Sequence, residues 1–550
     1  HKRYSVRKSI ASIMDFNSLW GINITKEIYM KKLILCLLLV MMSTSLMVFA
    51  SAQKEPVAEG DMSPITIDWF VNEGWYNRPW DAENTMVDKI ITEKTGISFN
   101  FMNSAGGGTG TEKLNAMIAA DNLTDVVTMG WWYTQYQELQ SAGMLQPLDV
   151  LMDKYAPSFK EATPQSMLNW YSFTDGHMYG FANMFWDEEQ FTDENYMGTN
   201  AGITARKDIM AQLGITADDF KTQDGMMAAL KKVKDANIQY NGVDVKPIYF
   251  TPNGGFPGTW VWDGMFAVPR EDKDGNFLDV RLQSEFKEYM RWANLLYREG
   301  LISKENYTSD RTQISEKIVS GQVFAVMCNI ADYMDPWKKL LRTDPEAMFV
   351  PVGPPQAPGQ GRPTFNSTGY TGWLLSSISK RSKYPERIIK LFEFLYSREG
   401  LMLCSYGVEG DTYEMVNGKV AWTDKYLDML NNDPDSIGGI VGNASMWLLH
   451  NSVIEQQVAP PPVTDGEKME KAIRSYFAEY TYNDTAFGNI NPLGGTDEAA
   501  MFAEIDTYWQ EQLPKMVLAD SEAEFDEVFD ASVAKIKQMG LDAVIAVQNE

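Results

Sequence analysis

The residues best suited to bind a ligand in this sequence are tryptophans that gather in short runs beside polar residues. Fifteen of the 16 tryptophans lie after residue 52. Aromatic rings cover apolar C–H faces, while neighbouring Asp, Asn, Glu or Arg side chains bond to hydroxyl groups, so such runs suit a sugar. The candidates are Trp75, Trp80, Trp131, Trp132, Trp186, Asp187, Trp260, Trp262, Asp263 and Trp447.

Each tryptophan could instead belong to a hydrophobic core. Trp170, Trp292, Trp373 and Trp509 fall on helical or strand patterns, which favours burial. Adjacent side chains cannot easily face one core, so the pair Trp131 and Trp132 favours a binding site.

Catalytic and metal-binding patterns are sparse. After residue 52 the two histidines, His177 and His450, lie far apart in the sequence, so neither a metal-ligand spacing nor a triad base stands out. His177 lies in a Thr-Asp-Gly-His turn that indicates a surface residue. The glycine run at 106–110 lacks the G-K-[ST] ending of a phosphate loop and indicates a mobile loop.

A segment that begins at Asp272 has part of the pattern of a calcium loop. Its sixth residue is Phe277, where glycine is needed, and its twelfth is Gln283, where glutamate is needed. A hairpin turn is the better interpretation. We therefore expect no cofactor, with Ca²⁺ as the alternative.

The elements that must position these residues predict an α/β fold. Alternating strand and helix patterns fall at 64–70, 84–96, 97–102, 111–120 and 125–129. This alternation is typical of a parallel sheet covered by helices. Loops after the carboxyl ends of such strands bind ligands, and Trp131 and Trp132 follow the strand at 125–129.

The overall composition is that of a globular protein. The 550 residues are 44% hydrophobic and 22% charged, which excludes global disorder. The net charge of -26 argues against duplex nucleic acid and anionic membranes as partners, because both require a basic surface. The length indicates two to four domains or one large two-lobed unit.

The first 52 residues differ in charge from the remainder. They carry seven basic and two acidic side chains, against 41 and 72 afterwards. Two lysines precede an apolar run at 33–50 that ends in Ala-Ser-Ala, a pattern typical of a secretory signal peptide. We expect a signal peptide at 30–52, an over-extended start at 1–29, and an exported protein, periplasmic or extracellular, after cleavage near Ala52. An uncleaved membrane anchor is the alternative.

The three cysteines predict neither a lipid anchor nor a disulfide scaffold. Cys36 lies within the apolar run and follows Leu35 rather than a small residue, so lipid attachment is not expected. For Cys328 and Cys404, two buried thiols are favoured over a disulfide.

Eight motifs follow one another in a recognisable order. They are EKLNAMIAADNLTDVVTM (112–129), SAGMLQPLDVLMDKYAP (141–157), TDGHMYGF (174–181), GITARKDIMAQLGI (202–215), LLYREGLIS (295–303), GQVFAVM (321–327), YPERIIKLFEFLYSREG (384–400) and GVEGDTYE (407–414). Together they resemble the family 1 extracellular solute-binding proteins of ABC importers, in particular the large oligosaccharide-binding branch with lipoprotein-type and alginate-binding members.

The resemblance implies a two-lobed α/β fold of the type II periplasmic-binding-protein kind, with the ligand in the cleft between lobes. The first lobe would comprise 60–180 and 367–435, and the second 181–366 and 436–550. It implies a binding protein rather than an enzyme, and a monomer. Hinge closure would capture a carbohydrate, an oligosaccharide by expectation, and deliver it to the membrane permease.

The resemblance and the loop positions together assign roles to residues. Sugar would stack on Trp75, Trp80, Trp131 and Trp132 from the first lobe and on Trp186, Trp260, Trp262 and Trp447 from the second. Asp187, Asp263 and Glu409 would accept hydrogen bonds from hydroxyls. Arg206 would hold the carboxylate of a uronate sugar. A structural ion pair of Arg206 with Asp208 is equally open.

Two other functions stay open on the sequence. A secreted glycoside hydrolase would explain the aromatic residues and the export signal, and it requires a close pair of carboxylates. No pair stands out, because 72 acidic residues after the leader give many chance pairs. A binding protein that serves a chemoreceptor would keep the fold without feeding a transporter.

Overall fold

The computed structural model describes residues 61–74, 76, 79–103, 111–187, 198–251, 265–367, 371–441, 448–488 and 490–550. The chain divides into two units, His1–Met62 and Ser63–Glu550, and every element below belongs to the second unit. The expected signal peptide lies outside the described residues. In the described part of the chain, no helix combines the length and apolar character needed to cross a bilayer.

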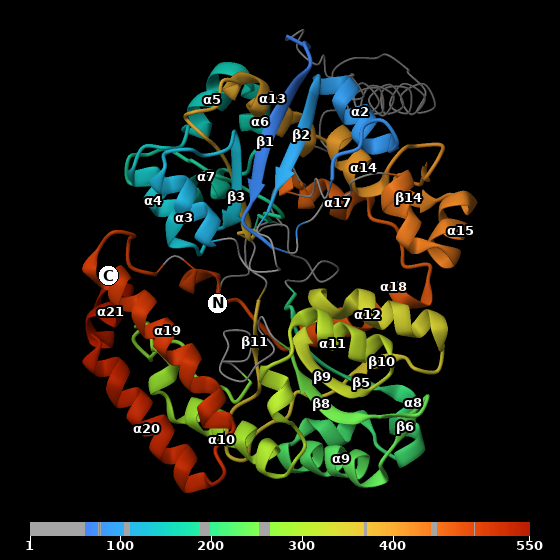
Figure 1. Cartoon of the computed structure of the whole chain (residues 1–550), viewed down its shortest axis with the longest axis vertical. Helices are drawn as coiled ribbons and strands as arrows, with labels where there is room; N and C mark the ends of the chain where they lie inside the picture. The colour runs from blue at the N-terminus through green and yellow to red at the C-terminus, as the bar shows by residue number, and fades with distance from the viewer. Residues whose placement is uncertain are drawn as a thin grey trace, which may run out of the picture. The chain divides into compact units, whose positions relative to one another are not determined.

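The first lobe is built on a five-stranded sheet with the order β2-β1-β3-β12-β4 (Figure 1). Its strands are β1 (Ile65–Val71), β2 (Ile97–Met102), β3 (Val126–Gly130), β12 (Leu374–Ile378) and β4 (Phe181–Ala182). β1 pairs in parallel with β2 and β3, as the sequence predicted, whereas β12 is antiparallel to β3 and β4. The sheet is mixed because β12 re-enters the first lobe after the chain has built most of the second.

Helices cover the first sheet and bury its aromatic residues. They are α2 (Met86–Thr95), α3 (Thr111–Ala119), α4 (Thr134–Ser141), α5 (Leu148–Tyr155), α6 (Pro157–Ala162), α7 (Gln165–Tyr171), α13 (Pro385–Tyr396) and α14 (Arg398–Tyr406). Gly96 ends α2 in the left-handed conformation at φ 67°, which glycine adopts without steric cost. The fully buried Trp69 ring lies 5.9 Å from Phe392 of α13, so the late helix completes the early core.

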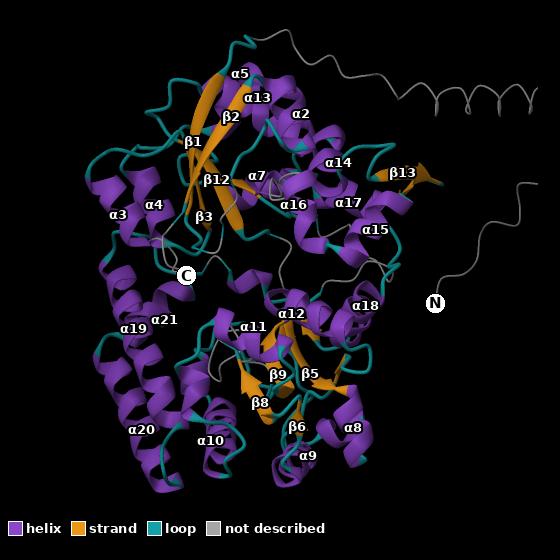
Figure 2. Ribbon diagram, turned by 45° about the vertical axis from the view of Figure 1, so that its right-hand side comes forward, coloured by secondary structure: helices purple, strands orange, loops and turns teal. Residues whose placement is uncertain are grey.

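The second lobe is built on a four-stranded sheet with the order β10-β5-β9-β8. Its strands are β5 (Ala201–Arg206), β8 (Lys246–Phe250), β9 (Val323–Asn329) and β10 (Phe349–Pro351). The helices beside it are α8 (Lys207–Leu213), α9 (Gln223–Ala236), α11 (Arg311–Val319), α12 (Ile330–Thr343) and α18 (Asp465–Ala478). Both ribbon views place α11 and α12 on the side nearest the first lobe and α8 and α9 on the far side (Figures 1 and 2).

A layer of four helices completes the described part of the second lobe. It consists of α10 (Ser284–Arg298), α19 (Asp497–Val517), α20 (Glu522–Gln538) and α21 (Leu541–Gln548) (Figure 2). Trp509 of α19 and Trp292 of α10 are buried in this lobe, as the helical patterns predicted.

The remaining smaller elements come from both lobes. They are β6 (Gln239–Tyr240), β7 (Val243–Asp244), β13 (Tyr413–Val416), β14 (Lys419–Trp422), α15 (Asp424–Asn432), α16 (Ile437–Ile440) and α17 (Ser452–Val458).

Each lobe has its own hydrophobic core. Phe365 belongs to the core of the second lobe and Leu374 to that of the first, so the chain passes from the second lobe to the first between these two residues. We call the described residues that directly precede β12, Thr371–Trp373, the crossing segment. On the second-lobe side this crossing begins with β11 (Phe365–Asn366), which pairs in parallel with β15 (Thr481–Tyr482). The two-lobed fold expected from the sequence is confirmed.

The first core extends further along the chain than the boundary that we expected at residues 435 and 436. Leu448 and Leu449 pack in the first core, and Val458 of α17 packs with Met402 of α14. Cys328 and Cys404 are buried in different cores and are unbonded thiols, as expected. Burial raises the pKa of both.

Candidate functional site

The candidate site begins at one edge of the first sheet, where β1, β3 and β4 end and β12 begins. We call this the strand-end edge and define it by Asn72, Gly130–Trp132, Asn183–Asp187 and Thr371–Trp373. Phe185 forms a β-bridge with Thr371, which brings the last two groups together. Carboxyl ends of sheet strands are the usual ligand-binding edge of an α/β fold.

Trp132 is the most accessible aromatic residue of the strand-end edge. Its side chain is 43% exposed, and its ring lies against Tyr133 with centroids 5.5 Å apart. A β-carbon on Gly130 would lie only 2.4 Å from Cζ2 of Trp132, so glycine is needed there for the ring to occupy this place. Trp132 therefore presents an apolar ring to solvent directly after β3.

Trp131 is held in a different way from its neighbour. Its backbone N–H donates to the carbonyl of Trp373 at 3.3 Å, and its indole N–H donates to the carbonyl of Gly372 at 3.2 Å. The ring meets that of Trp132 edge-on at 5.7 Å and 81°. Trp131 is therefore hydrogen-bonded to the chain that enters β12, whereas Trp132 leaves its ring exposed to solvent.

Two buried asparagines at the edge were missed by sequence reasoning. Asn72 and Asn183 are both fully buried. Asn183 Oδ1 accepts from the backbone N–H groups of Trp373 and Leu374, whereas neither side-chain polar atom of Asn72 has a partner among the described residues. The signal in the sequence was their position, because each directly follows a strand.

Trp186 and Asp187 lie at the same edge, beyond Phe185. Trp186 is half-buried, and Asp187 accepts a hydrogen bond from the hydroxyl of Ser166 at 3.2 Å. The structure thus brings together four of the predicted site residues: Trp131, Trp132, Trp186 and Asp187.

Trp80 and Glu409 lie elsewhere. The Trp80 indole N–H donates to Thr92 of α2 at 3.2 Å, and its ring packs edge-on against Phe99 of β2 at 4.6 Å. Glu409 is exposed in the turn between α14 and β13 and bridges to Tyr413. Within the described chain, no hydrogen bond or ring contact joins either residue to the strand-end edge.

The expected role of Arg206 as a carboxylate clamp is corrected by the structure. Arg206 is fully buried at the end of β5, where Nε donates to Asp208 at 2.8 Å and Nη1 donates to the carbonyl of Gly321 at 3.3 Å. Its guanidinium also lies 4.7 Å from the centre of the Tyr240 ring. The ion pair with Asp208 is therefore the observed role, at the start of α8 and away from the first lobe.

The end of β9 and the helices beside it carry polar residues of the second lobe. Asn329 ends β9, and the next helix, α12, carries Asp332 in its first turn. Arg311 of α11 pairs with Asp332 at 3.0 Å. Burial raises the pKa of Asp332, and Arg311 opposes that effect.

Five predicted site residues lie outside the described residues: Trp75, Trp260, Trp262, Asp263 and Trp447. The glycine run at 106–110 also lies outside them. Where the chain is described, no group of three or more His, Cys, Asp or Glu side chains is arranged to hold a metal ion.

The segment from Asp272 forms the expected hairpin turn. The Asp272 carboxylate accepts from the backbone N–H groups of Asp274 and Asn276, and Glu271 bridges to Phe277. The side chain and backbone of Asn276 lower the pKa of Asp272.

The two histidines bond to carboxylates. His177, in the predicted surface turn, lies 2.9 Å from Asp149, and the buried His450 lies 2.7 Å from Glu455.

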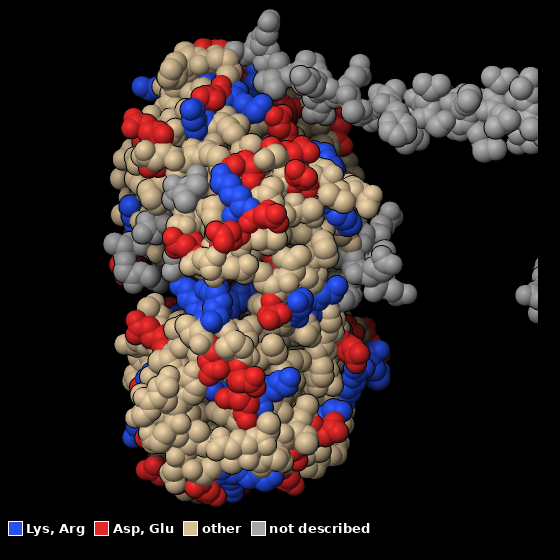
Figure 3. All heavy atoms as spheres, turned by 90° about the vertical axis from the view of Figure 1, so that its right-hand side faces the viewer, with Lys and Arg blue, Asp and Glu red and all other residues tan. Residues whose placement is uncertain are grey.

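The surface of the molecule shows no continuous basic stripe on the face drawn in Figure 3. Lys and Arg side chains are interspersed with Asp and Glu over both lobes there. This distribution agrees with the argument from net charge against a nucleic-acid partner.

Comparison with known families identifies the class of the protein. Residues 75–402, more than half of the chain, match the bacterial extracellular solute-binding protein family. The chain belongs to this family, whose members bind solutes and are not enzymes.

Curated relatives match over part of their length. The chain is 22% identical over 256 residues to lipoprotein LipO of Bacillus subtilis (strain 168), covering 42% of this chain and 50% of LipO. It is 25% identical over 154 residues to an uncharacterized protein in the butB 5' region of Niallia circulans, covering 28% and 59%. The matched part is therefore between half and three fifths of each relative.

Solved structures confirm the fold over almost their whole length. The ABC-transporter substrate-binding protein FusA of S. pneumoniae, in complex with kestose, has a TM-score of 0.68 at 16% identity and covers 88% of this chain and 98% of FusA. The alginate-binding protein AlgQ2 without calcium ion has a TM-score of 0.64 at 20% identity, with 90% and 99% covered. An HMO-binding solute-binding protein of Bifidobacterium longum infantis has a TM-score of 0.62 at 16% identity, with 88% and 98% covered.

Proposed function

We propose that this chain is the substrate-binding component of an ABC importer and that it captures an oligosaccharide. The observation that carries the proposal is Trp132, an exposed ring at the strand-end edge of the first sheet in a two-lobed solute-binding fold. An open aromatic face beside amide and carboxylate groups suits a sugar, because the ring covers C–H surface and the polar groups bond to hydroxyls.

The proposed mechanism is closure of the two lobes around the sugar. A ligand that contacts both lobes binds the closed state better than the open state, so it shifts the population toward closure. The first lobe would offer Trp132, Trp186 and Asp187, and the second lobe the residues that follow β8 and β9. A membrane permease would then recognise the closed form, and no bond of the sugar would be made or broken.

The relatives support this choice of ligand class. FusA was solved with kestose, and the Bifidobacterium protein is named as HMO-binding. AlgQ2 is named as alginate-binding, which adds an acidic polymer to the candidates. For an acidic sugar, Arg206 is no longer available as a partner because Asp208 and Gly321 occupy it. We further propose that residues 30–52 direct export, as the sequence indicates.

A thermal-shift screen of the purified chain against neutral and uronic oligosaccharides tests the proposal. A ligand at a thousandfold excess over its Kd stabilises the folded protein by about 4 kcal/mol. Recovery of the intact glycan after a shift supports the binding protein, and cleavage products would support a glycoside hydrolase instead. No shift with any glycan would contradict the proposed ligand class.

The partner needs a separate test. We expect the closed, sugar-bound chain to stimulate ATP hydrolysis by its permease in proteoliposomes, whereas the sugar-free chain does so less. Binding to a chemoreceptor domain without any effect on a transporter would favour the chemoreceptor alternative.

A further inference from the structure

Trp131 contacts three parts of the molecule that belong to different stretches of the chain. It follows β3 of the first lobe and meets Trp132 edge-on. It donates two hydrogen bonds to the crossing segment, to Gly372 and Trp373. It also faces Gly488 of the second lobe, where an added β-carbon would lie 3.5 Å from Cη2 of Trp131.

The crossing segment is fixed to the first lobe beside Trp131. Asn183 Oδ1 accepts from the backbone N–H of Trp373 at 3.2 Å and from that of Leu374 at 2.8 Å. Gly372 has a φ of 74°, and a β-carbon there would lie 2.0 Å from the carbonyl oxygen of Asn183. The Tyr171 hydroxyl donates to the carbonyl of Thr371. The chain therefore enters the first lobe in one defined conformation.

The second lobe reaches the same place through the segment after β15. Gly488 lies against Trp131 and Trp170, and further along this segment the Gly494 N–H donates to Oε1 of Gln137 in α4. Gln137 comes six residues after Trp131, so both contacts fall on one short stretch of the first lobe. We call the described residues 485–488 and 490–495 the docking segment.

We infer that Trp131 is a positioning residue that couples the Trp132 platform to the arrangement of the two lobes. Its ring supports Trp132 on one side and the docking segment on another, while its N–H groups fix the crossing segment. A sugar on Trp132 would therefore strengthen the docking of the second lobe through Trp131. This last step rests on the proposed function, whereas the link between Trp131, the crossing segment and the docking segment does not.

Hydrogen exchange of the full chain without ligand tests that link. The variant is Trp131→Phe, which keeps an aromatic ring and removes the indole N–H. The matched control is Trp80→Phe, which removes an equivalent indole hydrogen bond in the same lobe, to Thr92. We expect exchange in peptides covering 371–378 and 485–495 to rise about fivefold in Trp131→Phe and to stay unchanged in Trp80→Phe.

The opposite result would overturn the inference. Equal exchange of both segments in the two variants would make Trp131 an ordinary packing residue. If Trp131→Phe fails to fold, Gln137→Ala tests the docking contact beside Trp131, because this side chain is only partly buried and bonds to Gly494. Faster exchange at 485–495 in Gln137→Ala supports docking, and unchanged exchange contradicts it.

Kestose binding tests the coupling to ligand. Small-angle scattering should show that kestose makes the unmodified chain more compact, and that the change is smaller in Trp131→Phe even when kestose saturates it. Full compaction of Trp131→Phe would contradict the coupling. If kestose does not bind the unmodified chain, the proposed ligand fails at this probe, and the exchange experiment still decides the role of Trp131.

Discussion

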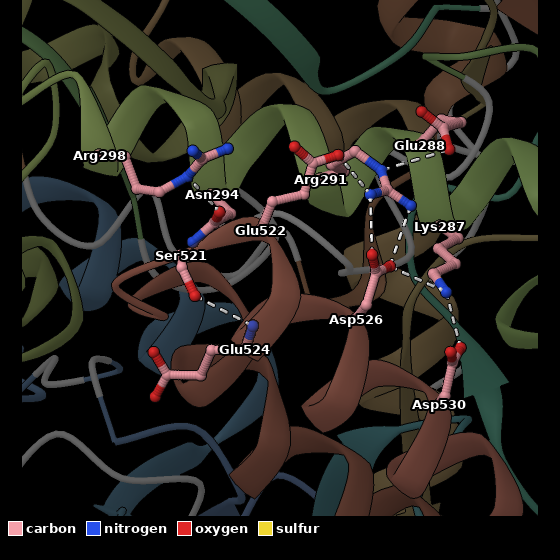
Figure 4. Close-up of polar contacts among 10 residues, drawn as sticks. All are labelled: Lys287, Glu288, Arg291, Asn294, Arg298, Ser521, Glu522, Glu524, Asp526 and Asp530. Atoms are coloured by element: carbon pink, nitrogen blue, oxygen red, sulfur yellow. Dashed lines mark hydrogen bonds and ion pairs between the residues drawn. The ribbon is translucent and has the colours of Figure 1, made fainter.

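The region between α10 and α20 of the second lobe and the strand-end edge of the first lobe engage their side chains differently. Between α10 and α20 of the second lobe, Arg291 binds Glu522 at 2.8 Å and Asp526 at 3.0 Å, and Figure 4 shows its guanidinium pointing between them. At the strand-end edge of the first lobe, neither side-chain polar atom of Asn72 has a partner among the described residues, and Trp132 is 43% exposed.

The difference separates side chains that are bonded within the fold from the exposed ring of Trp132, which is available to another molecule. A polar group that is fully bonded within the chain adds to stability and offers nothing to a ligand. Arg206 resembles Arg291 in this respect, because a carboxylate, a carbonyl and an aromatic ring surround its guanidinium within the chain. The family resemblance and its position in the chain had suggested Arg206 as a ligand residue, and its hydrogen bonds to Asp208 and Gly321 now exclude that role.

The largest expected effect is on stability, in Arg206→Met. Removal of the cation leaves Asp208 and the Gly321 carbonyl without their partner, so we expect a loss of about 3 kcal/mol in the free energy of unfolding. Urea denaturation of both proteins measures the loss. Affinity for any glycan found in the screen should stay the same, because Arg206 lies at the far side of the second lobe. A weaker affinity without loss of stability would restore Arg206 as a ligand residue.

Much of the fold could be predicted from the sequence, because local patterns determine it. The strand pattern at 97–102 matches β2, and the helical pattern expected at 111–120 matches α3. The alternation of strands and helices in the sequence was sufficient to predict that β1 pairs in parallel with β2 and β3. The antiparallel direction of β12 was not predictable in this way. It depends on how the chain returns from the second lobe, far later in the sequence than β3.

The site was less predictable because sequence spacing does not show where a side chain points. Trp131 and Trp132 are neighbours with the same chemistry, yet one bonds to the crossing segment and the other faces solvent. In the sequence Trp80 also lies in an aromatic run, but in the structure its ring packs against Phe99 rather than at the strand-end edge. Asn72 and Asn183 drew no attention, because a single asparagine after a strand is common and its burial depends on tertiary structure.

The second prediction concerns the exposed ring at the strand-end edge and uses the variant Trp132→Ala. Loss of the stacking ring should weaken binding of a glycan from the screen about tenfold, equivalent to about 1.4 kcal/mol. Stability should change by less than about 0.5 kcal/mol, since the side chain is largely exposed. Isothermal titration calorimetry and urea denaturation measure the two quantities.

Gly130→Ala provides the companion variant for Trp132. A β-carbon at residue 130 would displace the ring without removing it, so affinity should fall by less than in Trp132→Ala. Unchanged affinity in both variants would remove Trp132 from the site.

The third prediction concerns Asp526, between α10 and α20. The hydrogen bond from Lys287 lowers the pKa of Asp526 most, burial opposes this, and Arg291 lowers it further. A lowered pKa in the folded state gives stability that is present above the usual aspartate range and is lost as the pH falls through the lowered value. We therefore expect Asp526→Asn to cost about 0.5 kcal/mol at neutral pH, because the pair is partly exposed, and nothing in strong acid.

Urea denaturation across the acid range checks this prediction. Glu522, Glu288 and Asp530 face the same cations and titrate in the same range, so the comparison is between Asp526→Asn and the unmodified chain at each pH. A difference that is constant with pH would mean that packing, rather than charge, accounts for the effect.

The smallest effect is expected at His177, in the surface turn before β4. The hydrogen bond and charge of Asp149 raise the pKa of His177, with a smaller contribution from Asp175. A raised pKa in the folded state gives stability that is fully present below the usual histidine range and is lost as the pH rises through the raised value. His177→Gln should therefore lower the urea midpoint slightly at about pH 5.5 and leave it unchanged at about pH 9. A difference of equal size at both pH values would show that the contact with Asp149 acts as a neutral hydrogen bond, and that this surface turn does not depend on charge.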